Sequence, residues 1–252
     1  MTDLKAVAGK AIGLLDLTNL NDDCTPEDIV SLCARAQTPH GNTAAICIWK
    51  EFVAQAKGLL NGSGIRIATV VNFPNGGTDI EAVTGEVEAA LASGADEIDL
   101  VMPYRSLLDD DAAEAEAMIR AARHAAGDHL LKVILETGEL KSPQAIRSAS
   151  DLAIEAGADF IKTSTGKVKV NATLDAARIM LQAIADSGRE VGFKPAGGIK
   201  TTEDAAAYLE LAAEILGPDW ATPETFRFGA SGVLDNLLAT LDGGKTQETA
   251  GY

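Results

Sequence analysis

Short apolar runs alternate with longer, alanine-rich amphipathic segments along almost all of this 252-residue chain. Eight of the runs have the length and composition of buried β-strands. They read AIGLLDLT from Ala11, AAICIW from Ala44, RIATVVNF from Arg66, EIDLVMP from Glu97, LLKVILE from Leu130, FIKTST from Phe160, VGFKPA from Val191 and FRFGAS from Phe226. A helical pattern follows each run, so the sequence predicts a chain of strand–helix repeats.

Several predicted helices carry start signals. Thr25, Ser142 and Thr201 are good N-cap residues, and Pro26 and Pro143 suit the first helical position. Eight repeats in about 250 residues match the usual size of a (β/α)8 barrel. A doubly wound sheet stays open as the alternative, although it more often shows a glycine fingerprint after its first strand, which LLDLTNLNDD lacks. No linker rich in Pro, Gly or Ser divides the chain, so we expect one domain over residues 1–252, with a flexible tail at about 245–252.

Composition narrows the class of partner. The net charge of −16 argues against nucleic acid, and it would repel an anionic substrate unless cations gather locally. A solvated outer face is the simplest source of this acidity, and a salt-adapted host is an alternative. No apolar run approaches the roughly 18 to 20 residues of a membrane span. Three cysteines without CxxC spacing suit a reduced, cytoplasmic protein.

Charged residues interrupt five of the predicted strands: Asp16, Asp99, Lys132, Lys162 and Lys194. A match without gaps between SGADEIDLV and AGADFIKTS places Asp99 and Lys162 at equivalent positions. Both side chains should therefore point into the barrel at similar height. The echo could also be a common helix-to-strand joint, and a purely structural ion-pair network could explain the buried charges. Five such residues in one barrel favour a polar pocket with a chemical task.

Two of these residues suggest what that task is. Lys162 and Lys194 fall on consecutive predicted strands, roughly 5 Å apart. Like charge and partial desolvation favour the neutral amine of one partner, and a neutral lysine can form a Schiff base with a carbonyl. Asp99 could move the proton that carbinolamine dehydration requires. The three histidines form no HExxH or His/Cys cluster, so the pattern indicates a metal-free aldolase without a cofactor.

Glycines follow the last three predicted strands, where late loops of barrel enzymes often bind phosphate. The candidate phosphate-binding residues in these loops are Gly166, Lys167, Gly197, Gly198, Ser231 and Gly232. The backbone N–H groups of glycine loops can approach an anion, Lys167 adds charge, and Ser231 adds a hydroxyl near a helix start. The string STGK is not a P-loop, because Ile161 and Val168 stand where that motif requires Gly and Ser or Thr.

The motifs GADFIKTSTGK, VGFKPAGGIK, ADEIDLVMPYR, GNTAAICIW, TVVNFPNG and LKVILETGEL together resemble the deoxyribose-phosphate aldolase family of bacterial class I aldolases. The resemblance covers essentially the whole chain. It implies a TIM barrel that interconverts 2-deoxy-D-ribose 5-phosphate with D-glyceraldehyde 3-phosphate and acetaldehyde, in deoxyribonucleotide catabolism. It also implies a sugar phosphate and acetaldehyde as the small-molecule partners. A homodimer is one option for the assembly, which the sequence does not settle.

The resemblance assigns roles to individual residues. Lys162 would form the Schiff base, Lys194 would perturb that amine and join proton transfer, and Asp99 would work in the proton relay. Asp16, Thr18 and Cys47 match positions that line the substrate pocket, with Asp16 near the sugar hydroxyl. The family's phosphate site maps onto Gly166, Lys167, Gly197, Gly198 and Ser231. Lys132 and Tyr252 are further candidates, Tyr252 because the family's terminal tyrosine is thought to reach the pocket.

One departure from the family bears on the phosphate site. Close bacterial relatives carry paired serines where this chain reads Ser231-Gly232, so one hydroxyl is missing, although a Gly232 N–H could still serve the phosphate. We expect a modest change in affinity. Two rival functions stay open: a Schiff-base aldolase for a different sugar phosphate, and a non-catalytic sugar-phosphate sensor on a barrel scaffold.

Overall fold

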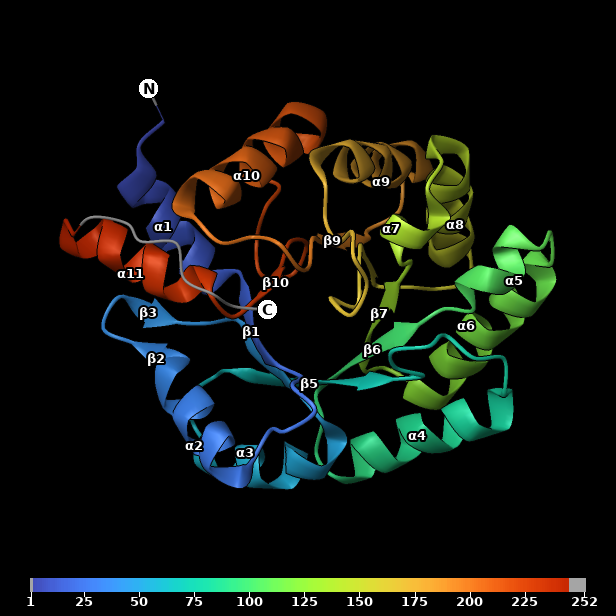
Figure 1. The fold of residues 1–252 in the computed structure, drawn as a ribbon, viewed down its shortest axis with the longest axis horizontal. Helices are drawn as coiled ribbons and strands as arrows, with labels where there is room; N and C mark the ends of the chain where they lie inside the picture. The colour runs from blue at the N-terminus through green and yellow to red at the C-terminus, as the bar shows by residue number, and fades with distance from the viewer. Residues whose placement is uncertain (1, 245–252) are drawn as a thin grey trace.

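Eight parallel strands wind into a barrel that is surrounded by helices (Figure 1). The structure is a computed structural model and describes residues 2–244. The barrel strands are β1 (Leu15–Asn19), β4 (Ala45–Ile48), β5 (Arg66–Val71), β6 (Glu97–Val101), β7 (Leu130–Ile134), β8 (Phe160–Lys162), β9 (Gly192–Lys194) and β10 (Phe228–Ala230). The expected tail at about 245–252, with Tyr252, lies outside the described residues.

The strands follow one another around the barrel in the order β10-β1-β4-β5-β6-β7-β8-β9. The two ends of this sheet meet through parallel bridges between Phe193 and Phe226 and between Ala196 and Gly229. The predicted (β/α)8 barrel is therefore confirmed, and the doubly wound alternative is wrong.

The helices cover the outside of the barrel (Figure 1). They are α1 (Leu4–Gly13), α2 (Pro26–Arg35), α3 (Val53–Leu59), α4 (Ile80–Ala92), α5 (Tyr104–Leu108), α6 (Ala112–Ala126), α7 (Thr137–Leu140), α8 (Pro143–Glu155), α9 (Leu174–Ser187), α10 (Thr202–Leu216) and α11 (Val233–Asp242). Thr25, Ser142 and Thr201 cap α2, α8 and α10, because each side-chain oxygen accepts a hydrogen bond from a backbone N–H in the first turn. These predicted helix starts are confirmed.

The first strand begins later than predicted. Ala11 belongs to the last turn of α1, and β1 begins at Leu15. Ala8, Ala11 and Ile12 form the buried stripe of that helix, so its apolar face runs directly into the apolar strand and hides the boundary. A short antiparallel hairpin of β2 (Gln37–Thr38) and β3 (Gly41–Asn42) also lies between α2 and β4, which the sequence pattern did not predict.

The repeated Gly-Ala-Asp joint has a structural role. Asp96 accepts a hydrogen bond from the backbone N–H of Ile67 at 2.9 Å, and Asp159 accepts one from Leu131 N–H at 2.7 Å. Each aspartate therefore ties the start of its own strand to the preceding strand. Because the two joints have the same construction, Asp99 and Lys162 enter the barrel three residues after equivalent anchors.

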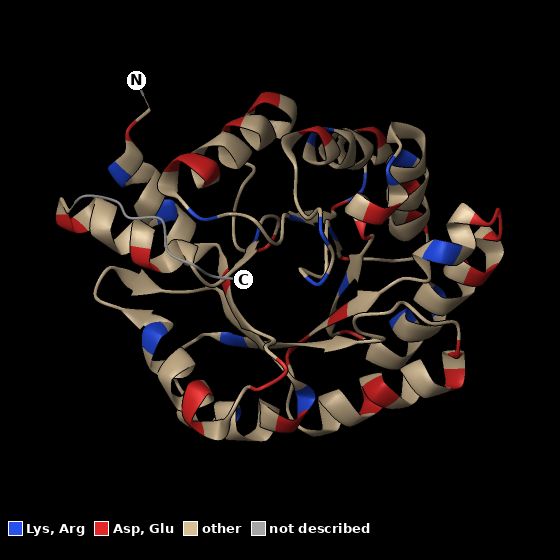
Figure 2. Ribbon diagram, viewed as in Figure 1, with Lys and Arg blue, Asp and Glu red and all other residues tan. Residues whose placement is uncertain are grey.

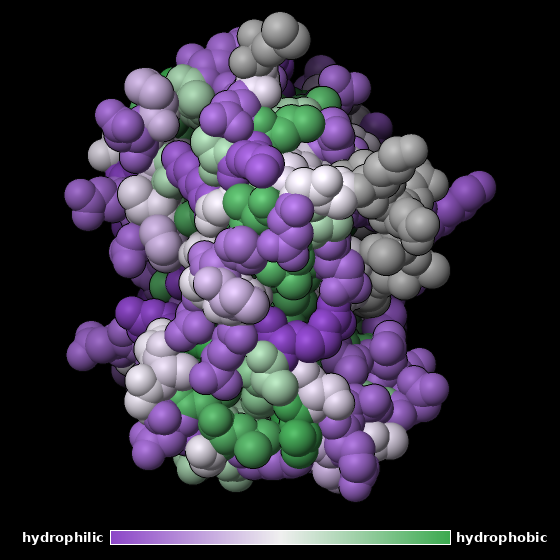
Figure 3. Space-filling view, turned by 90° about the vertical axis from the view of Figure 1, so that its left-hand side faces the viewer, coloured by the Kyte–Doolittle hydropathy of each residue, from purple (hydrophilic) through white to green (hydrophobic). Residues whose placement is uncertain are grey.

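Charge is distributed differently outside and inside the barrel. Asp and Glu residues are spread over the outer helices (Figure 2), in line with the net charge of −16. On the face that shows α1, α11 and α2, hydrophilic residues surround smaller apolar areas (Figure 3). No helix within residues 2–244 combines the length and apolar content that a membrane crossing needs.

Candidate active site

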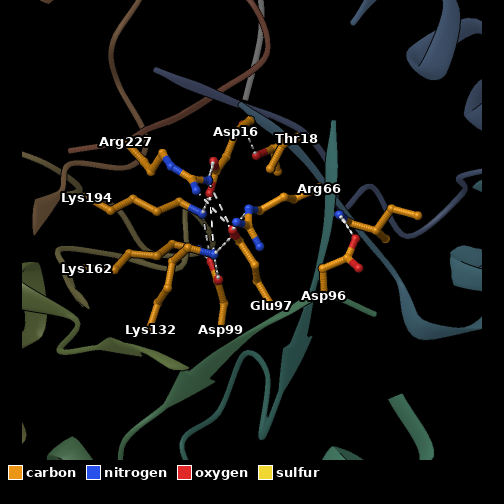
Figure 4. A network of polar contacts seen from close by, with 12 residues as sticks. Asp16, Thr18, Arg66, Asp96, Glu97, Asp99, Lys132, Lys162, Lys194 and Arg227 are labelled. Atoms are coloured by element: carbon orange, nitrogen blue, oxygen red, sulfur yellow. Dashed lines mark hydrogen bonds and ion pairs between the residues drawn. The ribbon is translucent and has the colours of Figure 1, made fainter. Parts of the chain in front are cut away.

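The five charged strand residues predicted from the sequence meet in the barrel interior. Their side chains point toward one another from β1, β6, β7, β8 and β9 (Figure 4). Lys162 and Lys194 are direct Cα partners in the β8–β9 ladder, and Asp99 and Lys132 are partners in the β6–β7 ladder. The prediction that Asp99 and Lys162 point into the barrel is confirmed, and so is the pairing of the two lysines.

Asp99 is the centre of this cluster, because three lysines share its carboxylate. Its Oδ1 accepts a hydrogen bond from Lys132 Nζ at 2.8 Å. Its Oδ2 accepts from both Lys162 Nζ and Lys194 Nζ, each at 2.8 Å. One oxygen thus joins the two amines that the sequence placed side by side, and a proton can pass between them through a single carboxylate.

Asp16 holds the other side of Lys194. Its Oδ2 accepts from Lys194 Nζ at 2.5 Å, and Lys132 Nζ lies 3.6 Å from the same oxygen. The backbone of Asp16 also accepts a hydrogen bond from the Thr18 hydroxyl at 2.8 Å. Thr18 and Cys47 are partners in the β1–β4 ladder, and both are buried. The predicted pocket residues Asp16, Thr18 and Cys47 therefore lie on two neighbouring strands.

Two members of the cluster were missed by the sequence reasoning. Arg227 donates to Asp16 Oδ1 at 2.7 Å and to Glu97 Oε1 at 2.9 Å, and Glu97 Oε2 accepts from Lys132 Nζ at 2.6 Å. Glu97 stands two residues before Asp99, on the same face of a strand, so the two-residue period could have found it. Arg227 interrupts the apolar run FRFGA, as the lysines interrupt theirs.

Burial and ion pairing together set the protonation states. Burial alone would raise the pKa of Asp99, but Lys132, Lys162 and Lys194 outweigh it and hold that pKa well below its usual range. Burial is likewise outweighed at Asp16, whose pKa is lowered by Lys194 and Arg227. Burial would lower the pKa of Lys194, but Asp16 and Asp99 raise it. The carboxylates are therefore ionised, and Lys194 is protonated, at neutral pH.

Lys132 is held in the same way. Burial would lower its pKa, but the carboxylates of Asp99 and Glu97 raise it. Lys132 and Lys194 are fully buried, whereas Lys162 keeps 3% of its surface exposed. Among the lysines of the cluster, Lys162 is the one that solvent reaches. It is also the last residue of β8, at the end of the barrel where enzymes of this fold carry their active sites.

The predicted phosphate-binding residues follow three neighbouring strands at this same end. Gly166 and Lys167 come after β8, Gly197 and Gly198 after β9, and Ser231 and Gly232 after β10. Gly197 N–H donates to the carbonyl of Gly229 at 3.1 Å, which joins the loop after β9 to strand β10. Gly197 and Gly198 have φ values of 79° and 85°, a backbone shape that favours glycine. Lys167 Nζ pairs with the exposed Asp22 at 3.0 Å.

A cavity of about 940 Å³ opens at the other end of the barrel. Its lining includes Arg66, Leu130 and Phe160, the first residues of β5, β7 and β8. Arg66 reaches inward to within 3.6 Å of Glu97, but more than half of its side chain is exposed. Within residues 2–244, none of the predicted site residues lines this cavity, so the charged cluster's Lys162 end and the cavity lie at opposite ends of the barrel.

Comparison with known proteins gives the cluster a family. The profile of the DeoC/LacD family aldolases matches residues 10–234. The chain belongs to this aldolase family. It is therefore a lyase that acts on carbon–carbon bonds. The deoxyribose-phosphate aldolase of Agrobacterium fabrum is 61% identical over 251 residues, which cover 98% of this chain and 97% of that protein.

Solved structures agree on the fold. A Coccidioides immitis protein provisionally described as a deoxyribose-phosphate aldolase has a TM-score of 0.80 at 31% identity, over 91% of this chain and 85% of its own. The tetrameric deoxyribose phosphate aldolase of Aeropyrum pernix has a TM-score of 0.73 at 23% identity, over 95% and 92% of the two chains. At that identity the second likeness supports the barrel alone.

Proposed function

We propose that the chain is a class I aldolase that reversibly cleaves 2-deoxy-D-ribose 5-phosphate through a Schiff base on Lys162. The products are D-glyceraldehyde 3-phosphate and acetaldehyde. The observation that carries this proposal is the sharing of Asp99 Oδ2 by Lys162 and Lys194 within a buried cluster in which Lys162 is the one lysine with exposed surface. The name of the Agrobacterium fabrum relative supports the substrate.

Ion pairing in the cluster supports Lys162 as the nucleophile. Its buried acids are Asp16, Glu97 and Asp99, and its buried cations are Lys132, Lys162, Lys194 and Arg227. Lys132 and Lys194 each donate to two of these carboxylates, whereas Lys162 pairs with Asp99, so its positive charge is the least stabilised of the three lysines. Raised pKa values keep Lys132 and Lys194 protonated, and arginine stays charged. We therefore propose Lys162 as the amine that reacts with the substrate.

The first half of the reaction forms the iminium ion. Neutral Lys162 Nζ attacks C1 of the open-chain aldehyde and gives a carbinolamine. The Lys194 ammonium then donates a proton to the departing hydroxyl, which leaves as water. The positive charge has moved from Lys194 to the iminium nitrogen on Lys162. Asp99 lies between the two nitrogens throughout and stabilises the charge on either side.

The second half breaks the C2–C3 bond, because C2 is next to the iminium carbon and C3 bears the hydroxyl. Neutral Lys194 takes the C3 hydroxyl proton through Asp99, and the C2–C3 electron pair neutralises the iminium to an enamine. C3 to C5 leave with the phosphate. The Lys194 ammonium then protonates C2, and water hydrolyses the new iminium to acetaldehyde while its spare proton returns to Lys194. The site ends with neutral Lys162 and protonated Lys194.

The loops after β8, β9 and β10 would hold the substrate's phosphate at the same end of the barrel. In this proposal Gly166, Gly197, Gly198, Ser231 and Gly232 line the phosphate site, and Lys167 supplies charge. Release of Lys167 from the exposed Asp22 costs little, because exposed ion pairs contribute at most about 1 kcal/mol. Asp16, Thr18 and Cys47 would line the sugar pocket.

The rival functions differ in what they predict. A non-catalytic sensor is not supported, because the chain belongs to an aldolase family. An aldolase for another sugar phosphate would use the same lysine with a different donor. Product analysis with acetaldehyde and with dihydroxyacetone phosphate as donors separates that alternative from ours.

Trapping the covalent intermediate is the direct test. The protein is treated with acetaldehyde and borohydride, digested and mapped by mass spectrometry. We expect a reduced adduct on Lys162 and none in a Lys162→Ala variant. A labelled Lys132 or Lys194 in place of Lys162, or no adduct, would refute the assignment.

We also propose a cytoplasmic location and a role in deoxyribonucleotide catabolism. The three free cysteines, Cys24, Cys33 and Cys47, support a reducing compartment. A homodimer is the assembly we propose, and sedimentation of the purified protein would test it.

A further inference from the structure

A buried acid that the mechanism does not use lies beside the site. Glu136 is the second residue after β7 and has no exposed surface. Its φ of 57° and ψ of 57° put it in the left-handed region, which a residue with a side chain adopts at a cost of roughly 1 kcal/mol. Burial of the carboxylate and the left-handed backbone of Glu136 both cost free energy. Contacts of this residue must therefore offset the two costs.

Both hydrogen bonds of its carboxylate go to the loop after β8. Glu136 Oε2 accepts a hydrogen bond from the Thr165 hydroxyl at 2.5 Å, and Oε1 accepts from Thr165 N–H at 3.2 Å. The same Thr165 hydroxyl oxygen accepts from Lys167 N–H at 3.0 Å. Glu136, Thr165 and Lys167 therefore form one continuous hydrogen-bond chain that runs across the Thr165-Gly166-Lys167 turn.

Burial raises the pKa of Glu136, and the bonds from Thr165 and the nearby charge of Lys162 oppose that effect. An isolated acid in this place would have no reason to stay ionised. The donors favour the carboxylate nonetheless, because Thr165 N–H can only donate to Oε1, and the Thr165 hydroxyl donates to Oε2 while its oxygen accepts from Lys167 N–H. The hydroxyl of Thr165 is thus fixed in one direction, with its oxygen turned to Lys167 N–H.

We propose that Glu136 is a positioning residue that shapes the Gly166-Lys167 turn for the substrate's phosphate and so gives phosphorylated sugars their advantage. This inference rests on the proposed function, since it assumes that Gly166 and Lys167 hold that phosphate. Glu136 lies behind Thr165 with no exposed surface, so its negative charge does not line the phosphate site.

Replacing Glu136 with glutamine tests the two hydrogen bonds between Glu136 and Thr165 with almost no change in side-chain shape. Glutamine can accept from Thr165 N–H, but its amide group then faces the Thr165 hydroxyl as a donor. That hydroxyl would receive two donors and would lose the acceptor for its own proton. Thr165→Val removes the hydroxyl from the other side of the same bond, and Thr165→Ser keeps it.

The experiment compares cleavage of 2-deoxyribose 5-phosphate with cleavage of unphosphorylated 2-deoxyribose. We expect Glu136→Gln and Thr165→Val to raise KM for the phosphorylated sugar by about tenfold, the scale of one lost hydrogen bond to a charged group. The value of kcat/KM for the unphosphorylated sugar should change less than about twofold. Thr165→Ser should restore the wild-type KM. A purely structural role would lower both activities together, and that result, like two unchanged activities, overturns the inference.

Binding of inorganic phosphate, measured by calorimetry, separates this inference from the proposed function. A wild-type protein that cleaves neither sugar refutes the proposed substrate. Even then, phosphate should bind the wild type and Thr165→Ser more tightly than Glu136→Gln and Thr165→Val. Equal phosphate affinities in all four proteins would overturn the role of Glu136 by themselves.

Discussion

Lys162 and Lys194 face each other across the β8–β9 ladder, and of the two only Lys162 has exposed surface. Both amines donate to the same oxygen of Asp99 at 2.8 Å. Lys194 has a second carboxylate, Asp16, and a raised pKa. The two lysines therefore differ. Lys194 is kept protonated by two carboxylates, and Lys162 is the one that a substrate can reach.

Replacing Lys194 should make Lys162 unreactive. In Lys194→Leu the cluster keeps three acids and three cations, so it balances only when Lys162 is protonated. We expect kcat to fall by at least about 10³-fold, because both the neutral nucleophile and its proton donor are lost. Circular dichroism should show an intact fold, since the remaining charges balance.

The same variant makes a pH prediction for the trapping reaction. Acetaldehyde adducts on Lys162 should form at neutral pH in the wild type and only at more alkaline pH in Lys194→Leu, because loss of the neighbouring cation favours the protonated amine. Wild-type turnover, or an unchanged pH profile of trapping, would contradict the coupling of the two lysines.

Acid stability should follow the lowered pKa values of Asp16 and Asp99. In the unfolded chain these acids take up protons near pH 4, and in the folded protein only at lower pH. Their contribution to the free energy of unfolding is therefore full above about pH 4 and is lost as the pH falls through the folded values. Melting temperatures measured from pH 2 to pH 7 should show a plateau and then a steep fall.

A control variant separates the cluster from surface charge. Glu214→Gln removes an exposed ion pair with Arg178 and should leave the acid transition where it is. A melting temperature that does not fall between pH 4 and pH 2 would mean that Asp16 and Asp99 titrate as they do in the unfolded chain. At the alkaline end, the raised pKa values of Lys132 and Lys194 extend the plateau, because their contribution is full below about pH 10.4 and is lost only above it.

Arg227→Met should destabilise the barrel strongly. It leaves Asp16 and Glu97 buried with one partner fewer, and such a loss costs about 3–5 kcal/mol. Thermal unfolding should show a decrease in Tm of roughly 6–20 °C for a chain of this length. The matched change Arg178→Met, at an exposed ion pair, should cost no more than about 1 kcal/mol. Equal effects of the two substitutions would show that Arg227 does not tie the interior together.

A side chain added at Gly192 should clash with its neighbours. A Cβ at this position of β9 would lie 2.5 Å from ring atoms of Phe160 on β8, which is almost fully buried. Gly192→Ala should therefore cost about 1–3 kcal/mol through overpacking. Gly9 in α1 has nothing within 4 Å of an added Cβ, so Gly9→Ala should stabilise the helix by about 0.5–1 kcal/mol. Chemical denaturation of the two variants should thus shift in opposite directions.

Gly232→Ser would supply the second hydroxyl of the family's serine pair. Gly232 has φ −69° and ψ −24°, which serine adopts without strain, and it is the N-cap of α11. We expect KM for 2-deoxyribose 5-phosphate to fall by roughly two- to fivefold, the scale of one added neutral hydrogen bond. An unchanged KM would indicate that the phosphate does not contact this residue.

The sequence predicted the repeating architecture and the lysine pair for physical reasons. A charge inside an apolar strand is costly, so Lys162, Lys194 and Asp99 stand out without any structure. The joint before Asp99 and Lys162 recurs, which fixed their common height. Glu97 and Arg227 follow the same logic, but each lies at or near the start of a strand, where a charged residue looks like a solvated end.

Other features depend on contacts between distant segments. Ala11 belongs to a helix, because α1 packs on α10 and α11 from the other end of the chain, and no local signal separates its apolar stripe from β1. The hydrogen bonds of Glu136 to Thr165 require the loop after β8 to lie beside it, and the pattern LETGEL alone does not reveal that. The roles of such residues can be identified only from the contacts of the folded barrel.

The position of Arg227 has a consequence for how the protein is made. Arg227 joins Asp16, near the beginning of the chain, to Glu97, near its middle, and it comes just before the last barrel strand. A nascent chain that has not yet reached residue 227 carries two acids that lack their guanidinium. Closure of the barrel and the link between Asp16 and Glu97 therefore both wait for the last barrel strand, so a chain that stops before residue 227 cannot assemble the complete cluster.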